Sequence, residues 1–131
     1  MTSGVDMVVD TSVILSVLFD EPSAAWAVER LEEHAPELRM STVNLAETLI
    51  LLRDRQPQLC EELEELVLTS GIRFVAPTVA QARIAAAARH RFPLNLGDCF
   101  AYALAQAERV SVLTLDADFA RTDIPVVLPG G

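Results

Sequence analysis

The run Met7–Val9 stops abruptly at Asp10, Thr11 and Ser12, and this change from apolar to polar residues is the feature that most constrains the fold. A short apolar run bounded by polar residues predicts a buried strand. In an open parallel sheet, residues that follow a strand at its carboxyl end lie at the crevice where ligands bind. The carboxylate of Asp10 is therefore expected at such an edge, with Thr11 or Ser12 capping the helix that follows.

Short apolar segments alternate with helical patterns along the rest of the chain, which favours an α/β sandwich with a mostly parallel sheet. Further strands are expected at residues 38–40, 72–75, 110–114 and 124–128, the last at an edge because it contains Pro125. Helices are expected at residues 13–19, 24–35, 43–52, 58–70, from the cap Thr78 to 91, and from Asp98 to 108.

The size and hydropathy of the chain indicate a single soluble domain. Its 131 residues suit one core, so one domain is expected over 1–131. The mean hydropathy is high, at +0.32, but no segment has the roughly 20 uninterrupted apolar residues of a membrane helix and no secretory leader is evident, so a cytoplasmic protein without membrane association is expected. Cys60 and Cys99 lack metal-ligand spacing and are expected as small core residues.

The charge balance excludes several classes of protein. The net charge of −9 argues against nonspecific coating of nucleic acid, which needs basic side chains, but it does not exclude an enzyme that cleaves nucleic acid. All ten basic residues are arginine. A chain without lysine cannot have a P-loop lysine, a Schiff-base amine or the lysine of a phosphorelay receiver.

Glu47 is an acid in an unexpected place. Its helical neighbours three and four positions away include Val43 and Ile50, so it projects from an apolar stripe. A lone carboxylate there is unfavourable unless it is paired, protonated or bound to a metal. A buried ion pair with Arg53 or Arg39 is the structural alternative.

Three further acids share this character. Asp98 is expected to open a helix whose same-side residues are small or aromatic, and Asp116 and Asp118 follow a strand as Asp10 does. Each has an ordinary alternative, because first-turn acids favour the helix dipole and acids after strands often form turns. Together, however, strand-end acids and acids on inward helix faces can converge at one edge of a parallel sheet.

Converging carboxylates repel one another, and a divalent cation is the usual means of keeping them ionised. Ligand sets made only of oxygen select hard ions such as Mg²⁺ or Mn²⁺. Such an ion can bind phosphate oxygens and activate a water for attack on phosphorus. The chemistry that fits is phosphodiester hydrolysis.

Four motifs in order, V-V-D-T-S, N-L-A-E, L-N-L-G-D-C-F-A-Y-A-L-A and L-T-L-D-A-D-F-A-R-T-D-I, resemble a PIN domain. More narrowly, they are similar to the VapC toxins of bacterial toxin–antitoxin pairs. The resemblance implies a three-layer α/β/α sandwich with about five short strands. It also implies a Mg²⁺- or Mn²⁺-dependent endoribonuclease acting on tRNA or rRNA, a homodimer, and inhibition by a cognate VapB-type antitoxin.

Carried over by position, the family's acidic site falls on Asp10, Glu47, Asp98 and Asp116. The resemblance makes Asp10 and Asp98 the most direct metal ligands, with Thr11 or Ser12 as a polar companion. Family members differ in how acids are arranged before the phenylalanine, so Asp118 is an alternative to Asp116.

Candidate RNA-binding residues are few. Arg89-His90-Arg91 is the basic cluster of the sequence, and Arg53 and Arg121 are close in sequence to Glu47 and Asp118. Arginine forks suit phosphate oxygens, although all of these can equally be surface residues. His34 and His90 are expected at the surface rather than as a catalytic base.

Two other functions are open to such a chain. A haloacid-type phosphatase also begins with a strand-end aspartate, but it needs a second aspartate where Ser12 stands, and a lysine. A degenerate PIN domain that only binds a partner protein is the non-enzymatic alternative, against which the retained acids argue.

Overall fold

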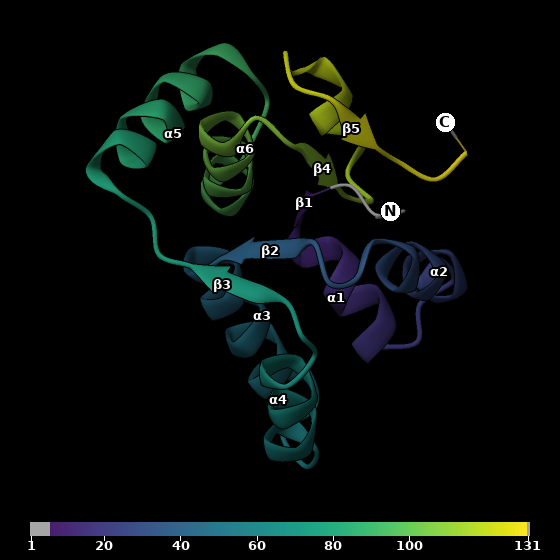
Figure 1. The fold of residues 1–131 in the computed structure, drawn as a ribbon. Helices are drawn as coiled ribbons and strands as arrows, with labels where there is room; N and C mark the ends of the chain where they lie inside the picture. Colours follow the sequence, from purple (N-terminus) through teal and green to yellow (C-terminus); the bar gives the residue numbers. More distant parts are fainter. Residues whose placement is uncertain (1–5, 131) are drawn as a thin grey trace.

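Five short strands form one sheet in the order β3-β2-β1-β4-β5, and every pairing is parallel (Figure 1). The computed structural model describes residues 6–130. The strands are β1 (Met7–Val9), β2 (Leu38–Ser41), β3 (Arg73–Val75), β4 (Ser111–Leu113) and β5 (Val126–Val127). The sequence-based expectation of an α/β fold with a parallel sheet of about five strands is confirmed, and β5 lies at an edge as expected.

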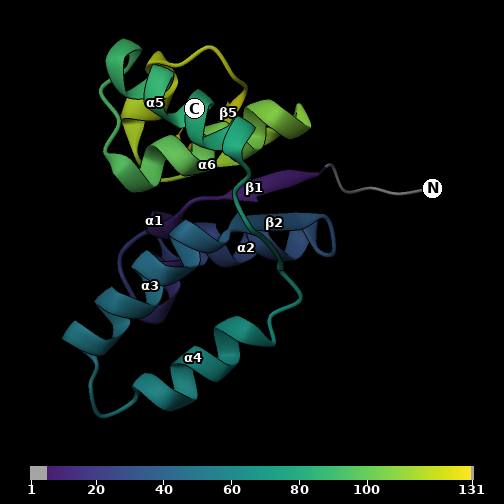
Figure 2. The ribbon, with the colours of Figure 1, turned by 90° about the vertical axis from the view of Figure 1, so that its left-hand side faces the viewer.

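Helices cover both faces of the sheet, giving three layers (Figures 1 and 2). On one face lie α5 (Val79–Arg91) and α6 (Leu96–Glu108). On the other face lie α1 (Thr11–Leu18), α2 (Ala24–His34), α3 (Thr42–Arg55) and α4 (Cys60–Leu68). A short 3₁₀ helix, η1 (Ala117–Arg121), joins β4 to β5.

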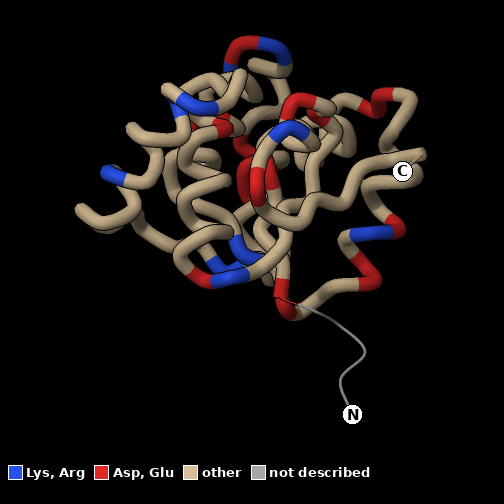
Figure 3. The backbone as a smooth tube through the Cα atoms, turned by 90° about the horizontal axis from the view of Figure 1, so that it is seen from above, with Lys and Arg blue, Asp and Glu red and all other residues tan. Residues whose placement is uncertain are grey.

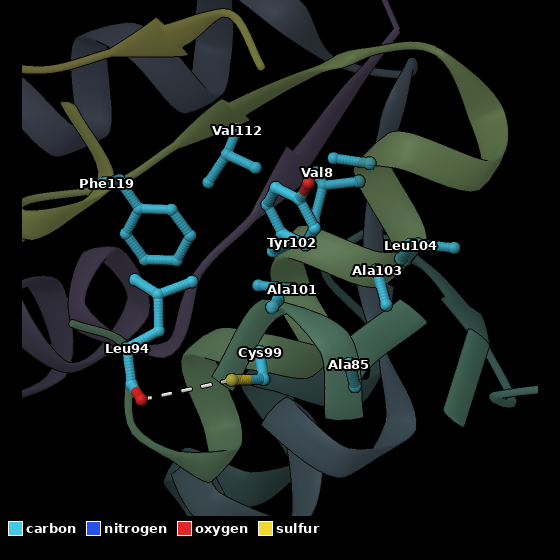
Figure 4. Close-up of a cluster of buried hydrophobic side chains, with 12 residues drawn as sticks. Val8, Ala85, Leu94, Cys99, Ala101, Tyr102, Ala103, Leu104, Val112 and Phe119 are labelled. Carbon is cyan, nitrogen blue, oxygen red and sulfur yellow. Dashed lines mark hydrogen bonds between the residues drawn. The ribbon is translucent and has the colours of Figure 1, made fainter. Parts of the chain in front are cut away.

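Two apolar cores separate these layers, and the alternation of side chains along a strand creates both. Val8 and Val112 face α5 and α6, where they pack with Tyr102 and Phe119 (Figure 4). Met7, Val9, Met40 and Leu113 face the opposite way, toward α1 and α2. The central strand β1 is thus buried on both faces. The polar residues that follow β1 are fixed at the sheet edge by this core.

Two helix starts differ from those expected. The helix α6 begins at Leu96, with Asn95 as its N-cap, so Asp98 is the third helical residue rather than the first. The helix α1 begins at Thr11 and its N-cap position is Asp10, which makes no side-chain cap bond. The expected capping by Thr11 or Ser12 is therefore wrong. The Thr11 hydroxyl donates to Glu47, and the Ser12 hydroxyl donates to Asp10 and accepts from the backbone N–H of Leu115.

Smaller differences concern α4 and the cysteines. The helix α4 begins at Cys60, two residues later than expected, and Cys60 is only half-buried rather than a core residue. Cys99 is buried in the core as expected, and burial raises the pKa of its thiol. Within residues 6–130, no helix is both long enough and apolar enough to span a membrane.

Candidate active site at the ends of β1 and β4

Asp10 follows β1 directly and is 2% exposed. Its Oδ2 accepts hydrogen bonds from the hydroxyls of Ser12 at 2.9 Å and Thr114 at 2.8 Å. Its Oδ1 is buried and has no hydrogen-bond partner among the residues the structure describes. Burial raises the pKa of the Asp10 carboxyl, the two hydroxyl bonds oppose this shift, and the charge of Glu47 adds to it.

Asp98 lies in the first turn of α6, locked in a capping box with Asn95. Its backbone N–H donates to Asn95 Oδ1 at 2.8 Å, and its Oδ2 accepts from the Asn95 backbone N–H at 3.4 Å. Burial and the charges of Asp10, Asp116 and Glu47 together raise the pKa of Asp98 to about 7, against the lowering effect of the Asn95 bond. Three carboxylates from other segments therefore act on Asp98 at this edge.

Glu47 is held toward this crevice by the first turn of α1. Thr11, whose side chain is buried, donates a hydrogen bond of 2.7 Å from its hydroxyl to Glu47 Oε1. Asn44, one helical turn before Glu47, donates from its side-chain amide to the Thr11 hydroxyl at 3.2 Å and to the carbonyl of Gly97 at 3.0 Å. The amide of Asn44 thus links α1, α3 and the start of α6.

The ion pair considered for Glu47 does not form. Arg39 pairs instead with Asp6 and Glu108. Arg53 pairs with Glu64 at 2.8 Å. Within residues 6–130, no arginine forms an ion pair with Glu47.

Apolar side chains do flank Glu47 on α3, but this stripe faces solvent rather than the core. Ile50 is 58% exposed, and Leu96 across from it is 70% exposed. Together with Val43 and Ala46 they line a groove of about 400 Å³ that contains Glu47. The inward face of α3 is instead formed by Asn44, Thr48 and Leu52.

Asp116 caps η1, and this role brings it to the crevice. Its Oδ1 accepts a hydrogen bond of 2.9 Å from the Asp118 backbone N–H. Its own N–H donates to the hydroxyl of Thr114 at 3.0 Å. The charge of Asp116 is among the causes that raise the pKa of Asp98.

Sequence reasoning missed Thr114 and Asn44, both of which are fully buried at the crevice. Thr114 follows β4 as Asp10 follows β1, so its strand-end position was an available signal. Asn44 lies three residues before Glu47 and hence on the same side of the helix. A polar residue within three positions of an acid in an unexpected place is the signal that could have identified both Asn44 and Thr114.

The candidate RNA-binding arginines are divided among three helices. Arg53 is on α3, Arg89 and Arg91 are in the last turn of α5, and Arg121 ends η1. Arg91 is exposed and pairs with Asp123 at 3.3 Å. Figure 3 shows basic positions scattered over several separate parts of the backbone.

Neither histidine belongs to the group of carboxylates. His90 is exposed on α5, as expected. His34, at the end of α2, has a side chain only 14% exposed and contacts Glu33, so the expectation of a surface residue is wrong there.

The donor set at this edge suits a hard divalent cation. All four acids supply oxygen ligands, which such ions prefer. One buried carboxylate oxygen of Asp10 has no protein partner within the described part of the chain. Burial and the charges of the other acids raise the pKa of Asp98. Across residues 6–130, no three or more acidic, histidine or cysteine side chains are grouped closely enough to hold a metal ion together as they stand. An open site is the form that Mg²⁺ takes, because it keeps several waters and binds through one or two carboxylates.

A second concave surface lies away from these acids, between α1, α2 and α4. It is an apolar groove of about 300 Å³ whose walls include Ile14, Val17, Leu31, Leu66 and Ile72. Leu66 on its rim is 61% exposed.

One protein family matches nearly the whole chain. A family model described as PIN domain matches residues 7–125. Ribonuclease VapC42 of Mycobacterium tuberculosis is 36% identical over 127 residues, which cover 90% of this chain and 96% of that protein. Ribonuclease VapC30 of the same species is 38% identical over 133 residues, covering 92% and 98%.

Solved structures share the fold. Mycobacterium tuberculosis VapC20, described as a sarcin-ricin loop cleaving toxin, superposes with a TM-score of 0.81 at 19% identity, covering 94% of this chain and 99% of that one. A toxin–antitoxin complex from Klebsiella pneumoniae superposes with a TM-score of 0.73 at 24% identity, covering 94% and 97%.

Proposed function

The chain belongs to the PIN domain family, and on this premise we propose that it is a metal-dependent endoribonuclease, the toxin of a type II toxin–antitoxin pair. The observation that carries the proposal is that Asp10, Asp116 and Glu47 all act on the buried Asp98, whose pKa is raised to about 7 by burial first and then by these charges. Relatives more than one-third identical over most of the chain bear the name ribonuclease. The substrate would be tRNA or rRNA, and the site of action the cytoplasm.

Each residue of the crevice has a defined task. Asp10 and Asp98 would be the direct ligands of Mg²⁺ or Mn²⁺, with Glu47 and Asp116 completing the acidic set. When bound, the ion supplies Lewis acidity at phosphorus and activates a water. Thr11 orients Glu47 and Thr114 orients Asp10 through the hydrogen bonds described. The exposed arginines Arg89 and Arg121 would contact phosphates away from the reacting bond.

Incubation of the purified chain with tRNA and with rRNA, with Mg²⁺ or with EDTA, tests this function. Cleavage that requires the metal supports the proposal. Absence of cleavage together with tight binding of a protein partner would favour the non-catalytic binding module instead.

We infer that the VapB-type antitoxin engages two surfaces. An amphipathic helix of the antitoxin would fill the apolar groove between α2 and α4, whose surroundings are acidic: Glu32 lines the groove, and Glu62 and Glu65 are exposed on α4. These acids and the net charge of −9 favour a partner segment with basic flanks. An antitoxin arginine among the crevice carboxylates would pair with them as a cation does. A complex structure with an open acidic crevice would contradict the second contact.

The expected homodimer has a candidate surface beside the crevice. Leu96, 70% exposed, borders both the groove that contains Glu47 and a second groove that contains Arg89. A two-fold axis near Leu96 would set the acidic side of one copy against the basic side of the other, which is a self-complementary arrangement. Light scattering on Ile50→Glu, with Val28→Glu on α2 as the control, tests this surface. A monomer is expected only for Ile50→Glu.

A further inference from the structure

Gly97 is the second residue of α6 and is buried between the exposed Leu96 and the acid Asp98. It has ordinary helical geometry, outside the left-handed region that only glycine adopts readily. Alanine at such a position favours a helix over glycine by about 1 kcal/mol. The backbone therefore does not explain why a glycine stands here.

The space beside Gly97 does explain it. A Cβ atom at this residue would lie 2.5 Å from Oε1 of Glu47 and 3.0 Å from its Cδ and Oε2. Real Cβ contacts essentially never fall below 3.0 Å. The carboxylate of Glu47 therefore occupies the volume that a side chain at residue 97 would need.

Hydrogen bonds hold both sides of this contact in place. The Thr11 hydroxyl donates to Glu47 Oε1 at 2.7 Å, which fixes the carboxylate. The Asn44 side chain donates to the Gly97 carbonyl at 3.0 Å, which fixes the first turn of α6 against α3. The close approach is thus part of one network and not an isolated contact.

We propose that Gly97 is a positioning residue: its missing side chain lets the Glu47 carboxylate lie against the first turn of α6, next to Asp98. With a methyl group at residue 97, Glu47 must swing toward the open groove lined by Val43 and Ile50. The inference rests on the proposed metal-dependent function, because its consequence is a change in metal affinity.

The variant Gly97→Ala separates positioning from folding. Only the far end of a half-buried side chain has to move, so we expect the melting temperature without metal to stay level or rise. We expect Mn²⁺ affinity, measured by calorimetry on the purified chain, to fall about 10–100-fold, the range typical when groups that orient ligands are disturbed. Ala107→Ser, which adds one heavy atom to an exposed position of the same helix, is the matched control and should bind Mn²⁺ as the wild type does.

A shorter acid should repair the defect. Glu47→Asp withdraws the carboxylate by one methylene, so in the Gly97→Ala background it removes the overlap. We expect Gly97→Ala/Glu47→Asp to bind Mn²⁺ more tightly than Gly97→Ala alone, although Glu47→Asp by itself weakens binding. Such coupling in a double-mutant cycle reports a direct contact. Additive losses would overturn the proposal.

The remaining outcomes distinguish failure of the proposed function from failure of the role of Gly97. If the wild type shows no Mn²⁺ binding, the proposed function fails, whereas wild-type binding with an unaffected Gly97→Ala overturns only the role of Gly97. If Gly97→Ala unfolds, Gly97→Ala/Glu47→Ala should fold again, because no carboxylate remains to overlap. Persistent unfolding of that double variant would contradict the proposal.

Discussion

The hydroxyl of Thr114 donates a hydrogen bond of 2.8 Å to Oδ2 of Asp10, joining residues 104 positions apart in the chain. The same hydroxyl accepts from the backbone N–H of Asp116 at 3.0 Å. Because Thr114 and Asp10 follow the neighbouring parallel strands β4 and β1, the topology of the sheet brings them together. One buried side chain thereby aligns two of the four acids.

Thr114→Val keeps the shape of this side chain and removes its hydroxyl. The change leaves the N–H of Asp116 without its acceptor and Asp10 with Ser12 as its one remaining hydroxyl donor, so we expect a loss of about 1–3 kcal/mol in the free energy of unfolding. Urea titration measures this. Thr69→Val, whose hydroxyl bonds an exposed helix carbonyl, serves as control, and equal losses in the two variants would contradict the role of Thr114.

Asp98→Asn retains the size of the side chain while removing one charge from the crevice. Repulsion in the metal-free protein should ease, so stability in EDTA should stay level or rise despite the loss of about 0.3–1 kcal/mol of helix-dipole interaction. The wild type should gain roughly 2.7 kcal/mol from Mg²⁺ at a hundred times its dissociation constant, and the variant much less. Thermal melts compare them. Equal Mg²⁺ shifts would leave Asp98 only its role as an acid in the first turn of α6.

Asp116→Asn and Asp118→Asn distinguish the two candidates for the fourth acid. Asp116 acts on the pKa of Asp98, so its replacement should lower the cleavage rate strongly, while Asp118→Asn should cleave at close to the wild-type rate. Initial rates on one labelled RNA measure this. The reverse order would assign the fourth position to Asp118.

The stability of the metal-free protein should depend on pH with a defined sign. The pKa of Asp98 rises from the ordinary 3.8 to about 7 in the folded state, and that of Asp10 is raised as well. The folded protein then holds protons that the unfolded chain has released. The stabilising contribution of the Asp98 proton is complete at pH values below the ordinary pKa of 3.8. It is lost as the pH rises through about 7.

Urea titrations in EDTA between mildly acidic and mildly alkaline pH measure this dependence. The free energy of unfolding of the wild type should decline across that pH interval, and that of Asp98→Asn should decline less. A wild-type stability that rises over the same interval would contradict a shared acidic crevice.

The fold was largely accessible from the sequence because its signals are local. The apolar runs before Asp10 and Thr114 mark strands, and their spacing by helical patterns indicates parallel pairing. Helix starts were less accessible. Asn95 rather than Asp98 caps α6, and both residue types are good N-caps, so preference alone does not choose between them.

The details of the site depended on contacts between distant segments. Periodicity placed Glu47 on an apolar stripe of its helix. The same periodic pattern fits a stripe buried in the core and a stripe exposed to solvent, and the exposed Ile50 shows that this stripe is of the second kind. The closeness of Gly97 to the Glu47 carboxylate depends on how α3 packs against α6, which no local pattern encodes. Long-range packing, rather than propensity, decides such contacts.

The most direct test of the acidic crevice as a metal-dependent ribonuclease site is end-group analysis of labelled RNA fragments. Wild type and Asp98→Asn would be compared, each with Mg²⁺ and with EDTA. Because His34 contacts Glu33 and His90 is exposed on α5, neither histidine is expected to activate a ribose hydroxyl, and water is the expected nucleophile. The account predicts fragments with 5′-phosphates from the wild type with Mg²⁺ and none from the other three reactions. Fragments ending in 2′,3′-cyclic phosphate, or cleavage that persists in EDTA or in Asp98→Asn, would contradict it.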